Sequence, residues 1–209
     1  MQLKQLLFGG LFFAAFSVAA VPSHAQAGRL GLNAGVNFAT IAGKDAEDMK
    51  LRTGFQAGVT YDFNLGNYLV LQPGVLYVQN GATSKVGVIE NMQLNYVQVP
   101  VTFQFQPTLG NGNLLLGVGP YIGLGVGKVK MGGTIGGVDW STKYHWDDIF
   151  EEGEELRKFD AGGKLLVGYQ LGMGLSFNLN FNRGLVKLNP NSESKFYNTA
   201  FGLTVGYKF

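Results

Sequence analysis

The fold is decided by the stretch at residues 196–209, FYNTAFGLTVGYKF, because its side chains alternate in character along its whole length. One side carries mainly large apolar groups, and the other carries small or polar groups. The first row is Tyr197, Thr199, Phe201, Leu203, Val205, Tyr207 and Phe209, and the second row is Asn198, Ala200, Gly202, Thr204, Gly206 and Lys208. A repeat of two predicts a β-strand whose two faces meet different environments.

Seven earlier segments repeat this alternation, at residues 31–38, 53–63, 68–79, 93–106, 114–127, 160–171 and 175–181. An eight-stranded barrel has an interior just wide enough for its own side chains or for one small ligand. The apolar rows therefore cannot all point inward, and a soluble, lipocalin-like barrel is disfavoured. The sequence predicts an all-β protein, an eight-stranded antiparallel transmembrane up-and-down β-barrel with its apolar rows toward lipid. Pro73, Pro100 and Pro120 interrupt three of these segments and predict local bulges, because proline cannot donate to a ladder.

The connections between these segments alternate in length. Longer, polar links at 39–52, 80–92, 128–159 and 188–195 alternate with short ones at 64–67, 107–113 and 172–174. Outer-membrane barrels have short periplasmic turns and longer outer loops. The pattern therefore predicts that both termini are periplasmic.

The composition excludes several classes of protein. Charged residues make up only 14% of the chain and the net charge is +2, which leaves no basic footprint for nucleic acid. No cysteine is present, so thiol catalysis and thiolate metal sites are excluded. We expect no metal site and no cofactor.

The N-terminal residues have the pattern of a cleaved secretory signal peptide. Lys4 precedes an apolar run at residues 6–20, which is followed by small residues that permit cleavage after Ala25 or Ala27. We therefore predict a signal peptide at 1–27 and a barrel domain at 28–209. Export combined with membrane-spanning strands predicts the outer membrane of a Gram-negative bacterium.

Four short motifs, in a fixed order, carry a resemblance to a known family. They are LQPGVLY (71–77), NYVQVPVTF (95–103), GVGPYIGLG (117–125) and FGLTVGYKF (201–209). With them the chain resembles the PorT-like outer-membrane β-barrel proteins of Bacteroidetes-type bacteria. The resemblance implies an eight-stranded outer-membrane barrel. It also implies that the barrel-assembly machinery reads the C-terminal strand as an insertion signal, through Phe201, Leu203, Val205, Tyr207 and Phe209.

Residues 128–159 are the main functional candidate, because this link contains both tryptophans of the chain. We expect it to contact a protein partner through Trp140, His145, Trp146, Asp147 and Asp148. A catalytic His145 is disfavoured, because a general base needs partners held at hydrogen-bond distance and a glycine-bearing loop does not provide them. The acidic run at 151–155 is interpreted as a solvated segment rather than as a cation site, since its spacing matches no EF-hand loop.

Four charged side chains point into the lumen by their position in the alternation. They are Arg29, Asp62, Lys164 and Lys208. Arg29, Asp62 and Lys208 share the short-turn end, so a buried ion pair is one hypothesis and solvated charges at a wet rim are the other.

The functional prediction is a small, non-enzymatic outer-membrane barrel that acts structurally or through ligands or partners bound by its outer loops. The alternative is a small porin-like channel for ions or small solutes, and a distant third is an enzyme that modifies lipid A. Expected partners are outer-membrane lipids and lipopolysaccharide, whose phosphates would meet Arg183, Lys187 and Lys195 at the outer rim.

Overall fold

The computed structural model describes residues 28–43, 49–84, 91–135, 138–146, 158–187 and 196–209. The signal peptide predicted at 1–27, with its cleavage positions, lies outside these ranges and stays a prediction. None of the described residues forms a helix that is long and apolar enough to cross a membrane.

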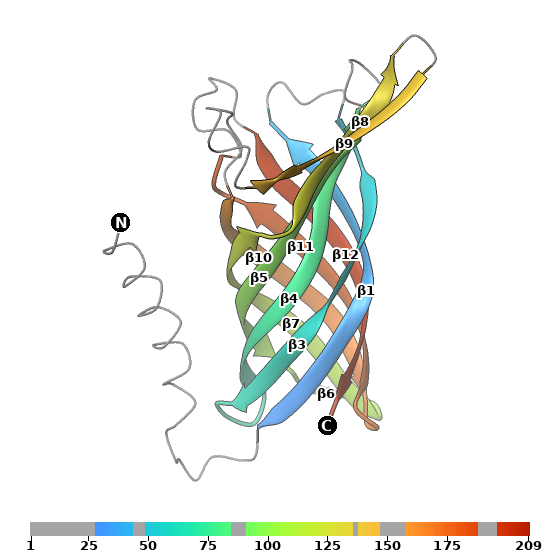
Figure 1. Ribbon diagram of the computed structural model, residues 1–209. Helices are drawn as coiled ribbons and strands as arrows, with labels where there is room; N and C mark the ends of the chain where they lie inside the picture. The colour runs from blue at the N-terminus through green and yellow to red at the C-terminus, as the bar shows by residue number, and fades with distance from the viewer. Residues whose placement is uncertain (1–27, 44–48, 85–90, 136–137, 147–157, 188–195) are drawn as a thin grey trace, which may run out of the picture.

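Eight antiparallel strands close into a barrel (Figure 1). They are β1 (Arg29–Ala42), β3 (Arg52–Asn64), β4 (Leu69–Ser84), β5 (Asn91–Phe105), β7 (Gly112–Gly125), β10 (Phe159–Leu171), β11 (Leu175–Gly184) and β12 (Tyr197–Lys208). The barrel closes where β1 pairs with β12, from Gly31 opposite Lys208 to Ala42 opposite Tyr197. The predicted eight-stranded barrel is confirmed.

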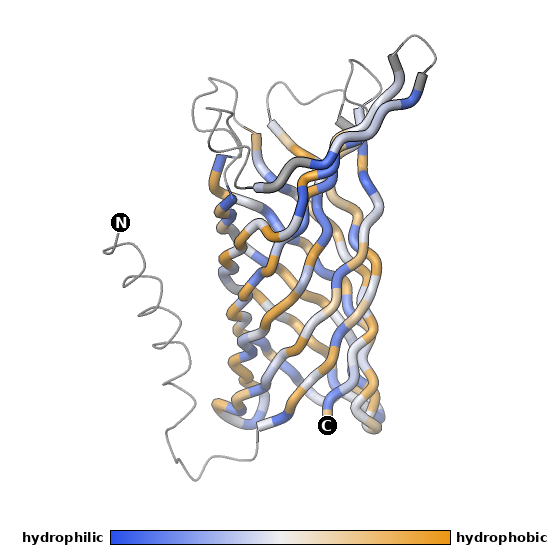
Figure 2. Tube along the Cα trace, viewed as in Figure 1, coloured by the Kyte–Doolittle hydropathy of each residue, from blue (hydrophilic) through white to orange (hydrophobic). Residues whose placement is uncertain are grey.

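One face of each barrel strand points outward and is apolar, and the other points inward and is polar. On β12 the predicted row from Phe201 to Phe209 lies outside, with Phe201 52% exposed and Phe209 66% exposed. Inward-pointing Asn180, Asn182 and Thr204 are buried. Figure 2 shows this alternation as a change of hydropathy at successive residues along the strands. A wall that is apolar outside and polar inside fits a barrel surrounded by lipid.

The three prolines do not produce the predicted bulges. Between β4 and β5 the pairs Pro73–Val101 and Leu76–Gln98 share one register, and the ladders beside Pro100 and Pro120 also continue without a shift. The pairing is only interrupted for two residues before it resumes. The missing donor therefore costs a hydrogen bond locally, and long ladders on either side keep the register.

The connections differ in length at the two ends of the barrel. The short turns at 65–68, 106–111 and 172–174 mark one end, which we call the short-turn end, and the opposite end is the loop end. At the short-turn end Gly174 has φ +92°, a conformation that favours glycine. β6 (Thr108–Leu109) pairs with β7 within the second turn. At the loop end β2 (Met49–Lys50) pairs with β4.

The prediction of a long loop at 128–159 is wrong for much of its length. Residues Lys128–Ile135 form β8 and residues Val138–His145 form β9, which together make a hairpin. β7 stops pairing with β5 at the Tyr96–Gly125 pair, and β8 then takes over the same edge of β5 at Asn91, Met92 and Gln93. The hydrogen-bonding groups that β7 leaves free on β5 anchor the base of this hairpin, whose two strands pair with each other along their length.

A charge on the outer face tests the assignment of that face to lipid. We expect Leu179→Arg, midway along β11 and 59% exposed, to lower the free energy of unfolding by about 2–4 kcal/mol in phospholipid vesicles. Asn111→Arg, at an exposed position of a short turn, is the control and should change it by less than about 0.5 kcal/mol. Urea titrations measure both. Equal tolerance of the two arginines would contradict a lipid-facing wall.

Candidate functional site

A chain of polar side chains lines the lumen at the short-turn end. The ammonium of Lys208 lies 2.6 Å from Asp62 Oδ2, and Gln72 Nε2 donates to Asp62 Oδ1 at 2.5 Å. Gln104 Nε2 then donates to Gln72 Oε1 at 2.7 Å, and Gln106 Nε2 donates to Gln104 Oε1 at 2.7 Å. Asp62 and Gln104 are only 3% and 2% exposed. The polar side chains therefore fill this end of the lumen, and we call them the floor network.

The hypothesis of a buried ion pair is confirmed for two of its three members. Lys208 reaches past β1 to Asp62 on β3, and both side chains are buried. Arg29 is exposed instead. It stands opposite Asp62 in the β1–β3 register, but it occupies the first position of β1, at the rim of the barrel.

An apolar cluster closes the lumen at the loop end. We call it the roof cluster; it consists of Ile41, Ala82, Leu94, Tyr96, Val129 and Trp146. The Trp146 ring lies 5.6 Å from that of Tyr96, and its Nε1 donates to the Val126 carbonyl at 3.3 Å. Gly125 leaves the space for it, because a Cβ there would lie 2.5 Å from Trp146 Cε2. The glycine row of β7 thus accommodates an indole at the mouth of the barrel.

A buried carboxylate lies in contact with the underside of the roof cluster. Asp160 Oδ2 accepts hydrogen bonds from Tyr121 Oη at 3.2 Å and from Asn198 Nδ2 at 3.0 Å. Asn198 Nδ2 also lies 3.5 Å from Tyr96 Oη, which links the carboxylate to the roof cluster. The arrangement joins four strands, β5, β7, β10 and β12. In the described part of the chain no three acidic or histidine side chains gather in a way that would hold a metal ion.

The β8–β9 hairpin projects beyond the wall of the barrel at the loop end (Figure 1). β8 pairs with β5 on one side and β9 on the other, whereas the outer edge of β9 pairs with no other described strand. A groove of ≈ 410 Å³ lies where the hairpin joins β5. Its lining is Asn91, Gln93, Lys130, Met131, Gly132, Gly133, Thr134, Asp139, Trp140 and Ser141. Among the described residues the indole N–H of Trp140 has no hydrogen-bond acceptor.

The structure separates the five predicted interaction residues. Trp140 lines the groove on the hairpin. The prediction for Trp146 is wrong, because this side chain is 1% exposed and belongs to the roof cluster. The backbone of His145 ends β9 opposite Lys128, but its side chain lies outside the described part of the molecule. Asp147 and Asp148 lie outside the described residues, as does the acidic run at 151–155.

The sequence reasoning missed the polar contacts that hold the lumen together. Position in the alternation already places Gln72, Gln104 and Asn198 on the inner face, but it does not show which strands their side chains join. Position in the alternation likewise places Tyr96 on the inner face of the 93–106 segment. Its neighbours are a tryptophan and an asparagine that are far away in the sequence, so no local signal could have found this contact.

Comparison with known proteins gives matches to solved structures and to a family model, while no curated protein matches the sequence. Neisserial surface protein A is 15% identical, with a TM-score of 0.49 over 90% of this chain and 100% of that one. The attachment invasion locus protein of Yersinia pestis, Ail, is 15% identical, with a TM-score of 0.47 over 88% of this chain and 100% of that one. The outer membrane protein OprG from Pseudomonas aeruginosa is 12% identical, with a TM-score of 0.48 over 88% and 97%. The model of the outer membrane protein beta-barrel domain family matches residues 11–209, and the chain therefore belongs to that family.

Proposed function

We propose that this outer-membrane barrel is not an enzyme and acts by binding a partner through the β8–β9 hairpin. The observation that carries the proposal is the contrast between the two parts of the molecule. The lumen is filled by the floor network and the roof cluster. The hairpin stands outside the barrel with an unpaired strand edge and a groove at its base.

The hairpin has two features that favour protein recognition. A free strand edge offers backbone N–H and C=O groups, to which an extended segment of a partner can add as a further strand. Trp140 belongs to this edge strand and lines the groove, and tryptophan is enriched at the energetic centre of protein interfaces. We infer that the partner pairs with β9 and covers Trp140.

We also propose an orientation of the barrel in the membrane. We place the short-turn end and both termini in the periplasm and the hairpin outside the cell, in keeping with the loop asymmetry of outer-membrane barrels.

Assignment to the PorT-like branch rests on the four motifs alone and stays a prediction. Lipopolysaccharide also stays a proposed partner. Arg183, one of the residues proposed to meet its phosphates, donates to Thr199 Oγ1 at 2.5 Å and lies over the Tyr197 ring.

A photo-cross-linking residue at Ser141, on exposed β9, tests the proposal in whole cells. We expect adducts with a discrete protein partner, and we expect Trp140→Ala to reduce their yield at least tenfold, as the loss of one interface anchor would. The same cross-linker at Leu185, which is 73% exposed and not part of the hairpin, is the matched control. Equal yields from both positions, or no adduct from Ser141, would contradict partner binding by the hairpin.

The two other functional classes have their own readouts. A porin-like channel would show stable openings in planar bilayers, whereas we expect none, because buried side chains fill the lumen. An enzyme acting on lipid A through His145 would leave a change in the lipid A mass spectrum that His145→Ala removes. We expect identical spectra for the two proteins.

A further inference from the structure

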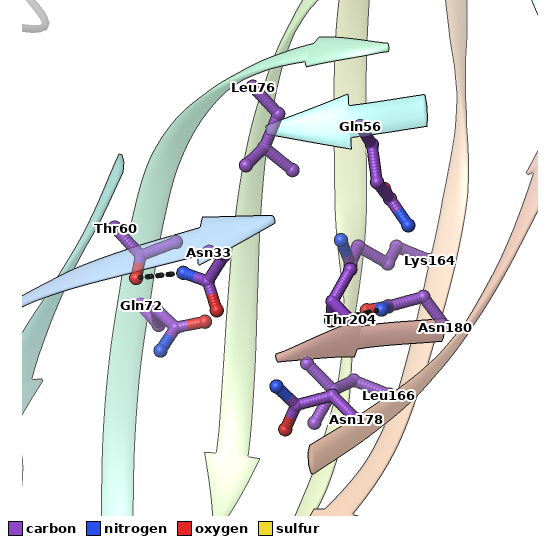
Figure 3. Close-up of a pocket in the computed structure, with 10 residues that line it drawn as sticks. All are labelled: Asn33, Gln56, Thr60, Gln72, Leu76, Lys164, Leu166, Asn178, Asn180 and Thr204. Atoms are coloured by element: carbon purple, nitrogen blue, oxygen red, sulfur yellow. Dashed lines mark hydrogen bonds between the residues drawn. The ribbon is translucent and has the colours of Figure 1, made fainter. Parts of the chain in front are cut away.

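Lys164 lies halfway along the lumen on β10 and faces a small cavity (Figure 3). The cavity has a volume of ≈ 20 Å³ and lies between the floor network and the roof cluster. Side chains from six strands line it, and they include Gln56, Lys164 and Asn180. The Lys164 side chain is only 7% exposed, so its ammonium is shielded from bulk solvent.

No carboxylate among the described residues neutralises this ammonium. Asp62 is paired with Lys208 in the floor network. Asp160 lies on the same strand and the same face, but four residues away, which corresponds to about 13 Å along a strand. It is also held by Tyr121 and Asn198. A buried charge without a counter-charge is unfavourable, so the cavity is electrostatically suited to an anion.

A second hydrogen-bond donor in the cavity lining has no acceptor. Gln56 Nε2 is buried and unpaired among the described residues. It lies over Gly202, where a side chain would collide with it, because a Cβ would come within 2.0 Å of that nitrogen. Neighbouring groups are already satisfied, since Asn180 donates to Thr204 at 3.1 Å and Asn33 donates to Thr60 at 3.0 Å. The Gln56 nitrogen has no accessible surface of its own, so the Lys164 ammonium supplies the donor that faces the cavity.

The size of the cavity limits what it holds. One water-sized particle needs about 10–15 Å³ on this measure, so ≈ 20 Å³ accommodates a single small ion but not a phosphate or a carboxylate ligand. We propose that the lumen binds one chloride-sized monovalent anion, which accepts a hydrogen bond from Lys164 Nζ. Water is the competing occupant, because the same space admits one water molecule.

Bromide distinguishes the two occupants directly. Crystals of the wild-type barrel grown in sodium bromide should show an anomalous peak in contact with Lys164 Nζ, because bromide scatters anomalously and water does not. An occupied site without an anomalous peak at saturating bromide would mean a water molecule only and would overturn the proposal. This measurement needs no variant, so it stays decisive even if a substituted barrel does not fold.

A solution experiment tests the role of the ammonium. Binding to the folded state alone raises its stability with ligand concentration. We therefore expect the wild-type barrel to unfold at a higher urea concentration in sodium chloride than in sodium gluconate of equal ionic strength. Lys164→Met should remove this difference, whereas Gln56→Leu, which keeps the charge, should leave it in place. An equal chloride effect in Lys164→Met, or no effect in the wild type, would overturn the proposal.

Discussion

Replacing Asp62 by alanine is expected to lower the free energy of unfolding by about 3–5 kcal/mol, which is the cost of leaving a buried charge without its partner. The substitution leaves the Lys208 ammonium inside the lumen, where it is 7% exposed. It also leaves Gln72 Nε2 without its acceptor, and Gln72 is the next member of the floor network. The loss should therefore exceed that of an exposed ion pair, which contributes at most about 1 kcal/mol.

Urea unfolding in phospholipid vesicles, followed by far-ultraviolet circular dichroism, measures this loss. The double variant Asp62→Leu with Lys208→Met is the informative control, because it removes both charges and fills their space with apolar side chains. Well-packed apolar replacements of buried ion pairs are often neutral or stabilising, so we expect the double variant to recover most of the stability. If Asp62→Ala alone were as stable as the wild type, the floor network would not be a buried structural element.

Replacing Trp146 by alanine is expected to cost about 3–5 kcal/mol, the usual range for deletion of a buried tryptophan side chain. The indole is the largest fully buried side chain of the described chain. Its loss removes the ring contact with Tyr96 and leaves a space above Gly125, where no side chain is present to fill it. The roof cluster should therefore loosen at the mouth of the barrel.

Trp140→Ala is the matched control, since it removes the same side chain from the projecting hairpin. We expect its effect on the free energy of unfolding to stay below about 1 kcal/mol, because Trp140 lines a groove rather than a core. The two variants should thus change different properties. Trp146→Ala should lower the free energy of unfolding, and Trp140→Ala should reduce partner binding. Equal losses of stability would mean that the hairpin and the roof cluster unfold as one unit.

The local pattern of the sequence was sufficient to predict the barrel wall. A repeat of two is a property of each strand alone, and it places Leu179 outside and Asn180 inside without any knowledge of the neighbouring strands. Position in the alternation also placed Asp62 and Lys208 on the inner face, where the structure finds them. The same reasoning failed for 128–159, because β8 forms by pairing with β9 along its length and with the edge of β5 that β7 leaves free.

The sequence by itself therefore determined the number of barrel strands, their inward and outward faces and the alternation of short and long connections. Only the tertiary structure decided which inward-facing groups meet. Lys208 and Asp62 are 146 residues apart in the sequence. Trp146 contacts Tyr96 although β7, β8 and β9 lie between them in the sequence. The physical reason is that alternation is fixed by the geometry of one chain segment, whereas contacts across a lumen exist only after the sheet has closed on itself.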